Sequence, residues 1–402
     1  MSSFAWLDFS ESDRQKALDV IDLFREKGTV DELGIGTVRD AFADLFFPGT
    51  STIMTRARYY LFVPWIYRRH ESKKTPSNEI ANSARKDEIA LVEALAKTDD
   101  IRGVIGIEAR SSLKRLPSAV YWQGLGQLGI RRYPGSRERY HGALDAFYKH
   151  GGSVVRGDDG NTVAGGILRN WDPALPPSPA GFPGTATLQM DRAEADYLRE
   201  RIIQSAPHSL FAFLVDRLVD ASEIAFAWEH PFWPQMTAKN RSELEHARNF
   251  SETMNGAALL YNLMLADKRK DEERIGEYAE LFAEWAAAMS ARMGELAAWS
   301  QTEFWALVHA TGARIGLATP AFINEWLGQA ICKDPGALSE SKAARRLIEQ
   351  RERTLKGQLA RLDNSRALDL WGGASSSGRL DYRWSRPVKT MLADMRSALG
   401  DA

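Results

Sequence analysis

The segment Asp31–Arg69 constrains the fold most, because it combines a helical apolar period with a sharp break. Apolar residues recur in Asp31–Phe47 at the spacing of one helix face. Pro48-Gly49 then breaks the chain, because proline fixes φ and glycine permits positive φ. The hydroxyl residues Thr50–Thr52 follow and predict the cap of a second helix, Ile53–Arg69, which its own proline interrupts.

The start of this second helix has the features of an anion-binding site. Free N–H groups at a helix N-terminus attract anions, and aromatic rings nearby can stack on bases. Alternatively, the rings belong to the core and the arginines to a solvated face. The residues expected to bind a nucleic-acid ligand here are Arg39, Thr50, Ser51, Thr52, Arg56, Arg58, Tyr59 and Trp65.

A second stretch, Ile101–Tyr140, is strongly basic and carries interleaved aromatic residues. Ser118–Leu128 is predicted to form a helix that begins at Pro117, and the segment is similar to a helix-turn-helix or winged module. The alternative is an ordinary helical subdomain with a charged exterior. The candidate DNA contacts in this stretch are Tyr121, Trp122, Arg131 and Arg132.

Helical patterns dominate the rest of the chain, beginning with an amphipathic segment at Ser10–Lys27. The expected fold is mainly α, with two or three packed helical subdomains and a minor β-hairpin around Asp159-Gly160. A Gly/Pro-rich linker at 151–187 is expected to separate an N-terminal domain, 1–150, from a C-terminal domain, 188–402, with a basic end.

Composition excludes several classes of function. The formal net charge is −1, so any nucleic-acid binding needs a local basic patch. The single cysteine, Cys332, excludes an internal disulfide framework, and the seven histidines show no metal-ligand spacing. We therefore expect neither a metal nor another cofactor, and a Mg²⁺ ion held by carboxylates is the alternative. The sequence has no apolar run of membrane-spanning length and no secretory leader, which predicts a cytoplasmic protein with no membrane partner.

Two carboxylates, Asp40 and Asp44, are the candidates for catalysis. They are four residues apart and therefore share a helical face next to the Pro-Gly break. Carboxylates stabilise the oxocarbenium-like state of glycosidic cleavage and activate water. Glu32 and Asp8 are further candidates. For each of them, a structural role as a cap or an ion-pair partner is the alternative.

Three strings carry a resemblance to a known family. MSSFAWLDFS, the FPGTSTI-x-TRARY string at 47–59 and RLDYRW at 379–384 resemble a bacterial family of unknown-function proteins found near anti-phage defence genes. The resemblance spans most of the chain and implies a relation to DNA glycosylases that act on modified phage bases. It implies double-stranded phage DNA as the partner and excision of a base such as glucosylated hydroxymethylcytosine, which leaves an abasic site.

A glycosylase must extrude the base from the stack, and it needs no metal or nucleotide cofactor. The alternative is a non-catalytic DNA-binding or adaptor subunit of a defence system, which would use the same basic segments. A nuclease is a weaker third option, because the chain contains none of the nuclease motifs PD-(D/E)xK, HNH or HKD.

Overall fold

The computed structural model describes residues 31–150, 154–156, 162–167, 169–375 and 378–400, and it is mainly α-helical, as the sequence predicts. The predicted helix Ser10–Lys27 and the candidate Asp8 lie outside the described residues. The chain forms two compact units. Among the described residues, the first unit contains Asp31–Ala41 and Glu245–Leu380, and the second contains Phe42–Leu244 and Asp381–Gly400.

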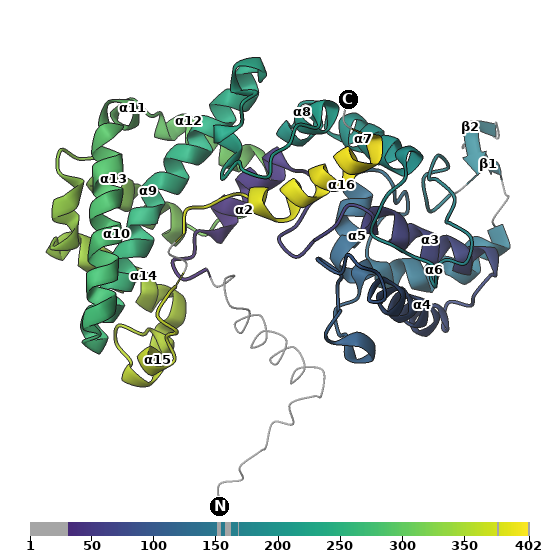
Figure 1. Cartoon of the computed structure of the whole chain (residues 1–402), viewed down its shortest axis with the longest axis horizontal. Coiled ribbons are helices and arrows are strands. Elements are labelled where there is room, and N and C mark those ends of the chain that lie inside the picture. The colour runs from purple at the N-terminus through teal and green to yellow at the C-terminus, as the bar shows by residue number, and fades with distance from the viewer. Residues whose placement is uncertain (1–30, 151–153, 157–161, 168, 376–377, 401–402) are drawn as a thin grey trace, which may run out of the picture. The chain divides into compact units, whose positions relative to one another are not determined.

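Two of the three divisions between the units fall inside helices α2 (Gly36–Phe46) and α9 (Ala238–Arg269), which Figure 1 labels, and the third follows Leu380. The other helices of the first unit are α10 (Glu272–Ala291), α11 (Met293–Ala297), α12 (Gln301–Ala310), α13 (Ala318–Ala330), α14 (Lys342–Lys356) and α15 (Ser365–Asp369). Those of the second unit are α3 (Tyr59–Ser72), α4 (Ile80–Leu95), α5 (Pro117–Gln127), α6 (Arg137–His150), α7 (Arg192–Ser205), α8 (Leu210–Arg217) and α16 (Lys389–Leu399). None of the described helices is long and apolar enough to cross a membrane.

The division differs from the expected boundaries at 150 and 187. The Pro-rich part of the expected linker packs on α3 within the second unit: the indole N–H of Trp65 donates to the Pro176 carbonyl at 2.7 Å, and Phe182 stacks on Phe62. Two short antiparallel strands, β1 (Val154–Arg156) and β2 (Thr162–Ile167), precede it. The turn expected at Asp159-Gly160 lies outside the described residues.

Helix α3 is the core of the second unit. Every residue from Tyr59 to Tyr67 is buried, and a helix that is apolar on all sides belongs in a core. The predicted helix Ile53–Arg69 therefore begins six residues late, at Tyr59, and Pro64 lies inside it without ending it. The predicted cap is wrong: no side chain caps α3, and the Thr50 hydroxyl donates to the Phe47 carbonyl instead.

Helix α9 has the same central place in the first unit. The indole N–H of Trp285, on α10, donates to the Glu252 carbonyl, and that of Trp326, on α13, donates to the Thr253 carbonyl. The hydroxyl of Tyr261 donates to the buried carboxylate of Glu352 on α14. Neighbouring helices thus contact α9 through large side chains that end in a hydrogen bond, which satisfies the polar atoms that burial would otherwise penalise.

The Pro48-Gly49 turn packs closely against α5 in the second unit. Gly49 has a φ of +85°, which a residue with a Cβ adopts only with strain. A Cβ on Gly124 would lie 2.1 Å from the Gly49 carbonyl oxygen. Glycine at both positions therefore permits the contact between this turn and α5.

We predict that Gly124→Ala destabilises the protein by about 1–3 kcal/mol, because backbone atoms must move to admit the methyl group. Gly142→Ala is the matched control: Gly142 lies inside α6, and an added Cβ there has no neighbour within 4 Å. It should be neutral or stabilising by up to about 1 kcal/mol through helix propensity. Urea unfolding measures both, and equal effects of the two substitutions would contradict the close contact.

A buried carboxylate joins α4 to α5. Glu88 is 1% exposed, and its two oxygens accept hydrogen bonds at 2.8 Å from the Ser118 N–H and the Ser118 hydroxyl. Burial raises the pKa of Glu88 to about 7, because desolvation disfavours the charged form more than the two hydrogen bonds favour it.

The raised pKa predicts a pH-dependent stability. The folded protein binds this proton more tightly than the unfolded chain, so the stabilisation is complete below the unfolded pKa of 4.5 and is lost as pH rises through about 7. The loss is on the order of 3 kcal/mol. Unfolding free energies at pH 5 and pH 8 should differ less in Glu88→Gln than in the wild type, whereas the exposed Glu79→Gln should retain the wild-type difference. An unchanged difference in Glu88→Gln would disprove the assignment.

Candidate functional site

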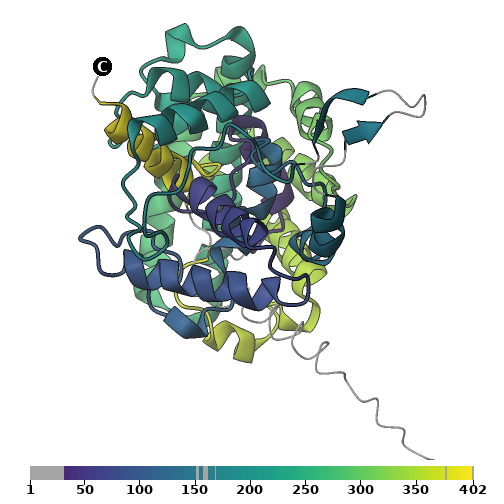
Figure 2. The same cartoon turned by 90° about the vertical axis from the view of Figure 1, so that its right-hand side faces the viewer.

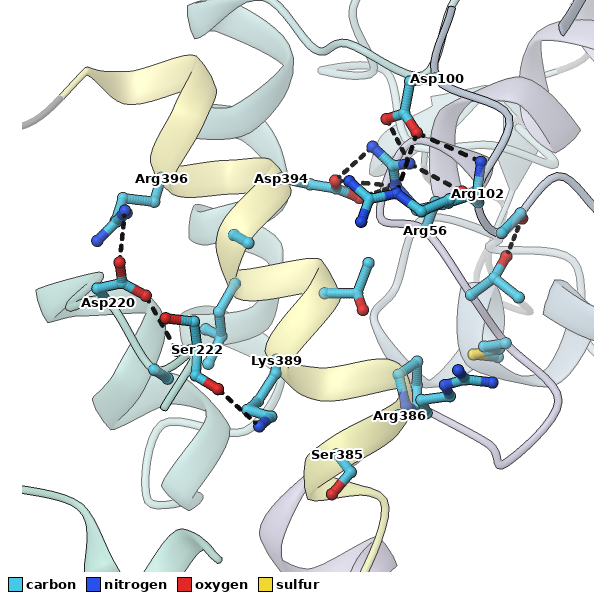
Figure 3. Close-up of a pocket in the computed structure, with 18 of the residues that line it drawn as sticks. Arg56, Asp100, Arg102, Asp220, Ser222, Ser385, Arg386, Lys389, Asp394 and Arg396 are labelled. Carbon is cyan, nitrogen blue, oxygen red and sulfur yellow. Dashed lines mark hydrogen bonds and ion pairs between the residues drawn. The ribbon is translucent and has the colours of Figure 1, made fainter. Parts of the chain in front are cut away.

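A groove with a volume of about 720 Å³ lies along α16 in the second unit. Figure 3 shows α16 passing between Asp220 and Ser222 on one side and Arg56, Asp100 and Arg102 on the other. We call this the α16 groove, and its lining consists of residues 54–56, 100, 102–103, 219–222, 385–387, 389–390, 392–394 and 396. It brings the FPGTSTI-x-TRARY segment together with the C-terminal part of the chain.

Apolar packing holds α16 in place. Met391, Leu392 and Met395 are buried on one side of the helix, which lies against α7 and α8 (Figures 1 and 2). Ahead of the helix, Trp384 stacks on Phe47 and donates its indole N–H to the Ile224 carbonyl at 3.0 Å. The residues of α16 that line the groove are Lys389, Thr390, Leu392, Ala393, Asp394 and Arg396.

Arg56 joins three segments at one end of the groove (Figure 3). Its Nε donates to both oxygens of Asp394 at 2.9 and 3.0 Å, and its Nη1 donates to Asp100 at 2.7 Å and to the Arg102 carbonyl at 2.9 Å. The N–H of Ala57 also donates to Asp394, at 2.9 Å. Arg56 is thus committed to protein partners and is not free to hold a ligand's anion.

The groove carboxylates differ in their electrostatics. Burial raises the pKa of Asp394, against the opposing effect of the Arg56 hydrogen bonds and charge. Burial acts in the same direction on Asp100, but there the hydrogen bond and charge of Arg56 outweigh it and lower the pKa. Hydrogen bonds from Ser222, with a smaller effect of Arg396, lower the pKa of Asp220. Asp100 and Asp220 are therefore ionised at neutral pH.

The groove has five cationic side chains and three carboxylates, a formal excess of two positive charges on a chain with a net charge of −1. Lys389 donates to the carbonyls of Ser222 and Ile224, and Arg396 to Asp220. Arg102 has a side chain that is 95% exposed, and its nearest carboxylate oxygen, on Asp100, is 4.0 Å away. Arg386 is exposed and has no ion-pair partner among the described residues. Two guanidinium groups are thus available to a ligand.

The predicted catalytic pair lies outside this groove. Asp40 pairs with its neighbour Arg39 at 3.0 Å, and Asp44 accepts a hydrogen bond of 2.6 Å from Arg383, which also donates to the Thr50 carbonyl. Thr50, Ser51 and Thr52 do not line the groove either. The Asp44–Arg383 pair anchors the RLDYRW string, in which Tyr382 and Arg383 both have positive φ angles, 54° and 70°.

The aromatic candidates are core residues. Tyr59, Trp65, Tyr121 and Trp122 are each at most 4% exposed, so in this structure none presents a ring on which a base could stack. The Tyr121 hydroxyl accepts hydrogen bonds from the N–H groups of Thr55 and Arg56 and donates to the Arg56 carbonyl. The Tyr121 side chain therefore holds the backbone of Thr55 and Arg56, two residues that line the groove.

The arginine candidates outside the groove are also paired. Arg58 donates to Glu194 at 2.6 Å, and Arg131 lies over the Trp122 ring and donates to two backbone carbonyls. Arg132 pairs with Asp172 at 3.0 Å, although half of its side chain is exposed. Burial and pairing leave Arg58 and Arg131 unavailable for DNA. Glu32, a further carboxylate candidate, is buried between Lys356 and Arg361 in the first unit.

Sequence reasoning singled out Arg56 but missed most of the groove. The missed charged residues are Asp100, Arg102, Asp220, Arg386, Lys389, Asp394 and Arg396. The available signal was the density of basic residues in RWSRPVKTMLADMR, at 383–396, next to the RLDYRW string. Within the described residues, no three His, Cys, Asp or Glu side chains are grouped so as to hold a metal ion.

The chain belongs to a protein family of unknown function (DUF6361), whose sequence profile matches residues 1–397. No curated protein and no solved structure matches the chain significantly. The family's description carries no activity, so the relation to anti-phage glycosylases stays a prediction.

We predict strong coupling between Arg56 and Asp394, whose side chains are 10% and 6% exposed. Arg56→Met should lower the free energy of unfolding by about 3–5 kcal/mol, because it leaves Asp394 buried without its cation. Arg56→Met combined with Asp394→Leu should recover most of that loss. Urea unfolding of the two single variants and the double variant measures the coupling, with Arg102→Met as the exposed control. Additive effects would contradict it.

Proposed function

We propose that the protein is a DNA glycosylase that removes a modified base from phage DNA, and that the α16 groove receives the extruded nucleotide. The observation that carries the proposal is the local excess of positive charge around a groove of nucleotide size, on a chain that has no positive charge overall. Neutralising phosphates releases counterions from DNA, so a local cluster of cations favours DNA binding. The volume falls within the range of about 300–1,000 Å³ that is usual for small-molecule sites.

Arg102 and Arg386 are the groups that would contact phosphates or stack on the extruded base. Their guanidinium groups are planar, and such planes stack on unpaired bases as aromatic rings do. Thr55, Ser222, Ser385 and Thr390 place hydroxyls along the groove, which suits a base that carries a sugar. Glucosylated hydroxymethylcytosine is accordingly the first substrate to test.

Asp100 and Asp220 are the carboxylates that would stabilise the transition state. In glycosidic hydrolysis the C1′–N bond breaks, the base leaves with the bonding electrons, and water forms the new C1′–O bond and gives up a proton, which the departing base takes up. The positive charge that develops on the sugar favours a nearby carboxylate that is already ionised. The catalytic role moves to these two residues from Asp40 and Asp44, because neither of the latter lines the groove.

One observation favours the second candidate, a DNA-binding subunit without catalysis. Each of the three groove carboxylates is hydrogen-bonded to an arginine, so none is without a cation partner. A groove of this kind can bind a nucleotide and leave it intact.

The decisive test incubates modified and unmodified phage DNA with the protein and then adds an abasic-site endonuclease. The glycosylase should release free base and yield strand breaks only in modified DNA and only after the endonuclease. Asp100→Asn or Asp220→Asn should abolish base release while DNA binding persists, whereas Asp44→Asn should still release the base. Binding of modified DNA without any base release would support the binding subunit. Breaks before the endonuclease step would indicate a nuclease.

DNA affinity tests the groove separately from the chemistry. Arg102→Ala and Arg386→Ala should each weaken binding and reduce the salt slope by about one, because each would remove one phosphate contact. Arg314→Ala is the control, since Arg314 is an exposed arginine of the first unit. If all three variants bind like the wild type, the groove is not the DNA site.

A further inference from the structure

The second unit contains another cavity, which shares no residue with the α16 groove. Its volume is about 400 Å³. It lies between the segment that leads into α8 and the segment that leads into α9. The residues that line it are Ile203, Pro207–Ser209, Ala212, Phe213, Asp216, Arg217, Thr237, Lys239 and Asn240.

Two helix N-termini meet at this cavity. Ser209 caps α8, an eight-residue helix, by accepting a hydrogen bond from the Ala212 N–H at 3.1 Å. Thr237 does the same for α9 by accepting from the Asn240 N–H at 3.1 Å. The first N–H groups of a helix have no acceptor within it, and the helix dipole adds a partial positive charge there. Two such ends beside one cavity favour an anion.

Asn240 gives an independent indication of a ligand. The residue is 2% exposed, lines the cavity, and has a side-chain oxygen with no hydrogen-bond partner. A buried acceptor without a donor is unfavourable, and a phosphate that keeps a proton has a hydroxyl that can donate to this oxygen.

The charged side chains of the cavity are consistent with this. Lys239 is 58% exposed, and its only ion-pair partner among the described residues is Glu243, at 3.7 Å. Arg217 lies over the Phe213 ring and donates to the Phe213 carbonyl and to Asp216, the one carboxylate in the lining. Asp216 is also paired with Arg199, so its negative charge is countered twice. His208 adds a ring nitrogen.

We propose that this cavity is a phosphate-binding site in which the N-termini of α8 and α9, Lys239 and Asn240 hold the oxyanion. The ligand is either free inorganic phosphate or a phosphate group of a nucleic acid. The opposite end of α8 leads to residues 219–222 of the α16 groove, and a helix of eight residues is about 12 Å long. A nucleotide strand that occupied the groove would thus carry phosphates about as far away as this cavity lies. This link between the two sites rests on the proposed function.

The test is calorimetric titration of the full chain with sodium phosphate at constant ionic strength. The wild type should bind one phosphate, and bound phosphate should raise the unfolding temperature through mass action. Lys239→Ala should weaken binding at least tenfold, because it removes the exposed cation. Asn240→Asp keeps the side chain's shape but adds a repelling charge, and it should also weaken binding at least tenfold.

Lys97→Ala is the matched control, an exposed lysine of the same unit that should bind phosphate like the wild type. The proposal is overturned if the wild type does not bind phosphate, or if Lys239→Ala and Asn240→Asp bind it as well as Lys97→Ala does.

A second titration, with a short oligodeoxynucleotide, separates the two sources. Competition by phosphate and weaker oligonucleotide binding in Lys239→Ala identify a nucleic-acid phosphate. Loss of phosphate binding with unchanged oligonucleotide binding identifies free phosphate. Base release by the groove variants is measured apart from both titrations, so failure of the glycosylase proposal does not decide this one.

Discussion

The guanidinium group of Arg56 is the interaction on which the second unit depends. It holds both oxygens of Asp394, one oxygen of Asp100 and the Arg102 carbonyl, and so ties α16 to two segments from the first third of the chain. A buried charge is tolerated only with compensating partners, which explains why three segments converge on this one side chain. The α16 groove is formed where these three segments meet.

The structure also distinguishes the two interpretations that the sequence left open for a central segment. Asp31–Arg69 does organise its surroundings, but as core: α3 buries the rings that a sequence reader assigns to base stacking. A local signal did identify α5, because proline at a first helical position needs no distant partner. The groove had no comparable signal. Its decisive pair, Arg56–Asp394, joins residues 338 positions apart, and charge alone does not reveal which carboxylate an arginine will meet.

Pairing within the protein also reduces the positive charge that the basic segments present to a ligand. Counting arginines along the sequence overstates the charge available to DNA, because Arg58 and Arg131 are buried and donate hydrogen bonds to protein oxygens. In the groove, the guanidinium groups that remain for a ligand are those of Arg102 and Arg386. A neutral chain can thus still present a positive site, provided that its carboxylates form ion pairs with the buried cations and leave the exposed cations unpaired.

The split of the second unit along the chain has a consequence for the order of synthesis. Phe42–Leu244 is made first, and α16 follows only after Glu245–Leu380, an interval on the order of 10 s at typical synthesis rates. During that interval Arg56 has Asp100 as a partner but not yet Asp394, and the surfaces of α7 and α8 that receive α16 are uncovered. The nascent protein therefore passes through a stage with an apolar, chaperone-accessible face, and the groove is completed only after α16 has left the ribosome.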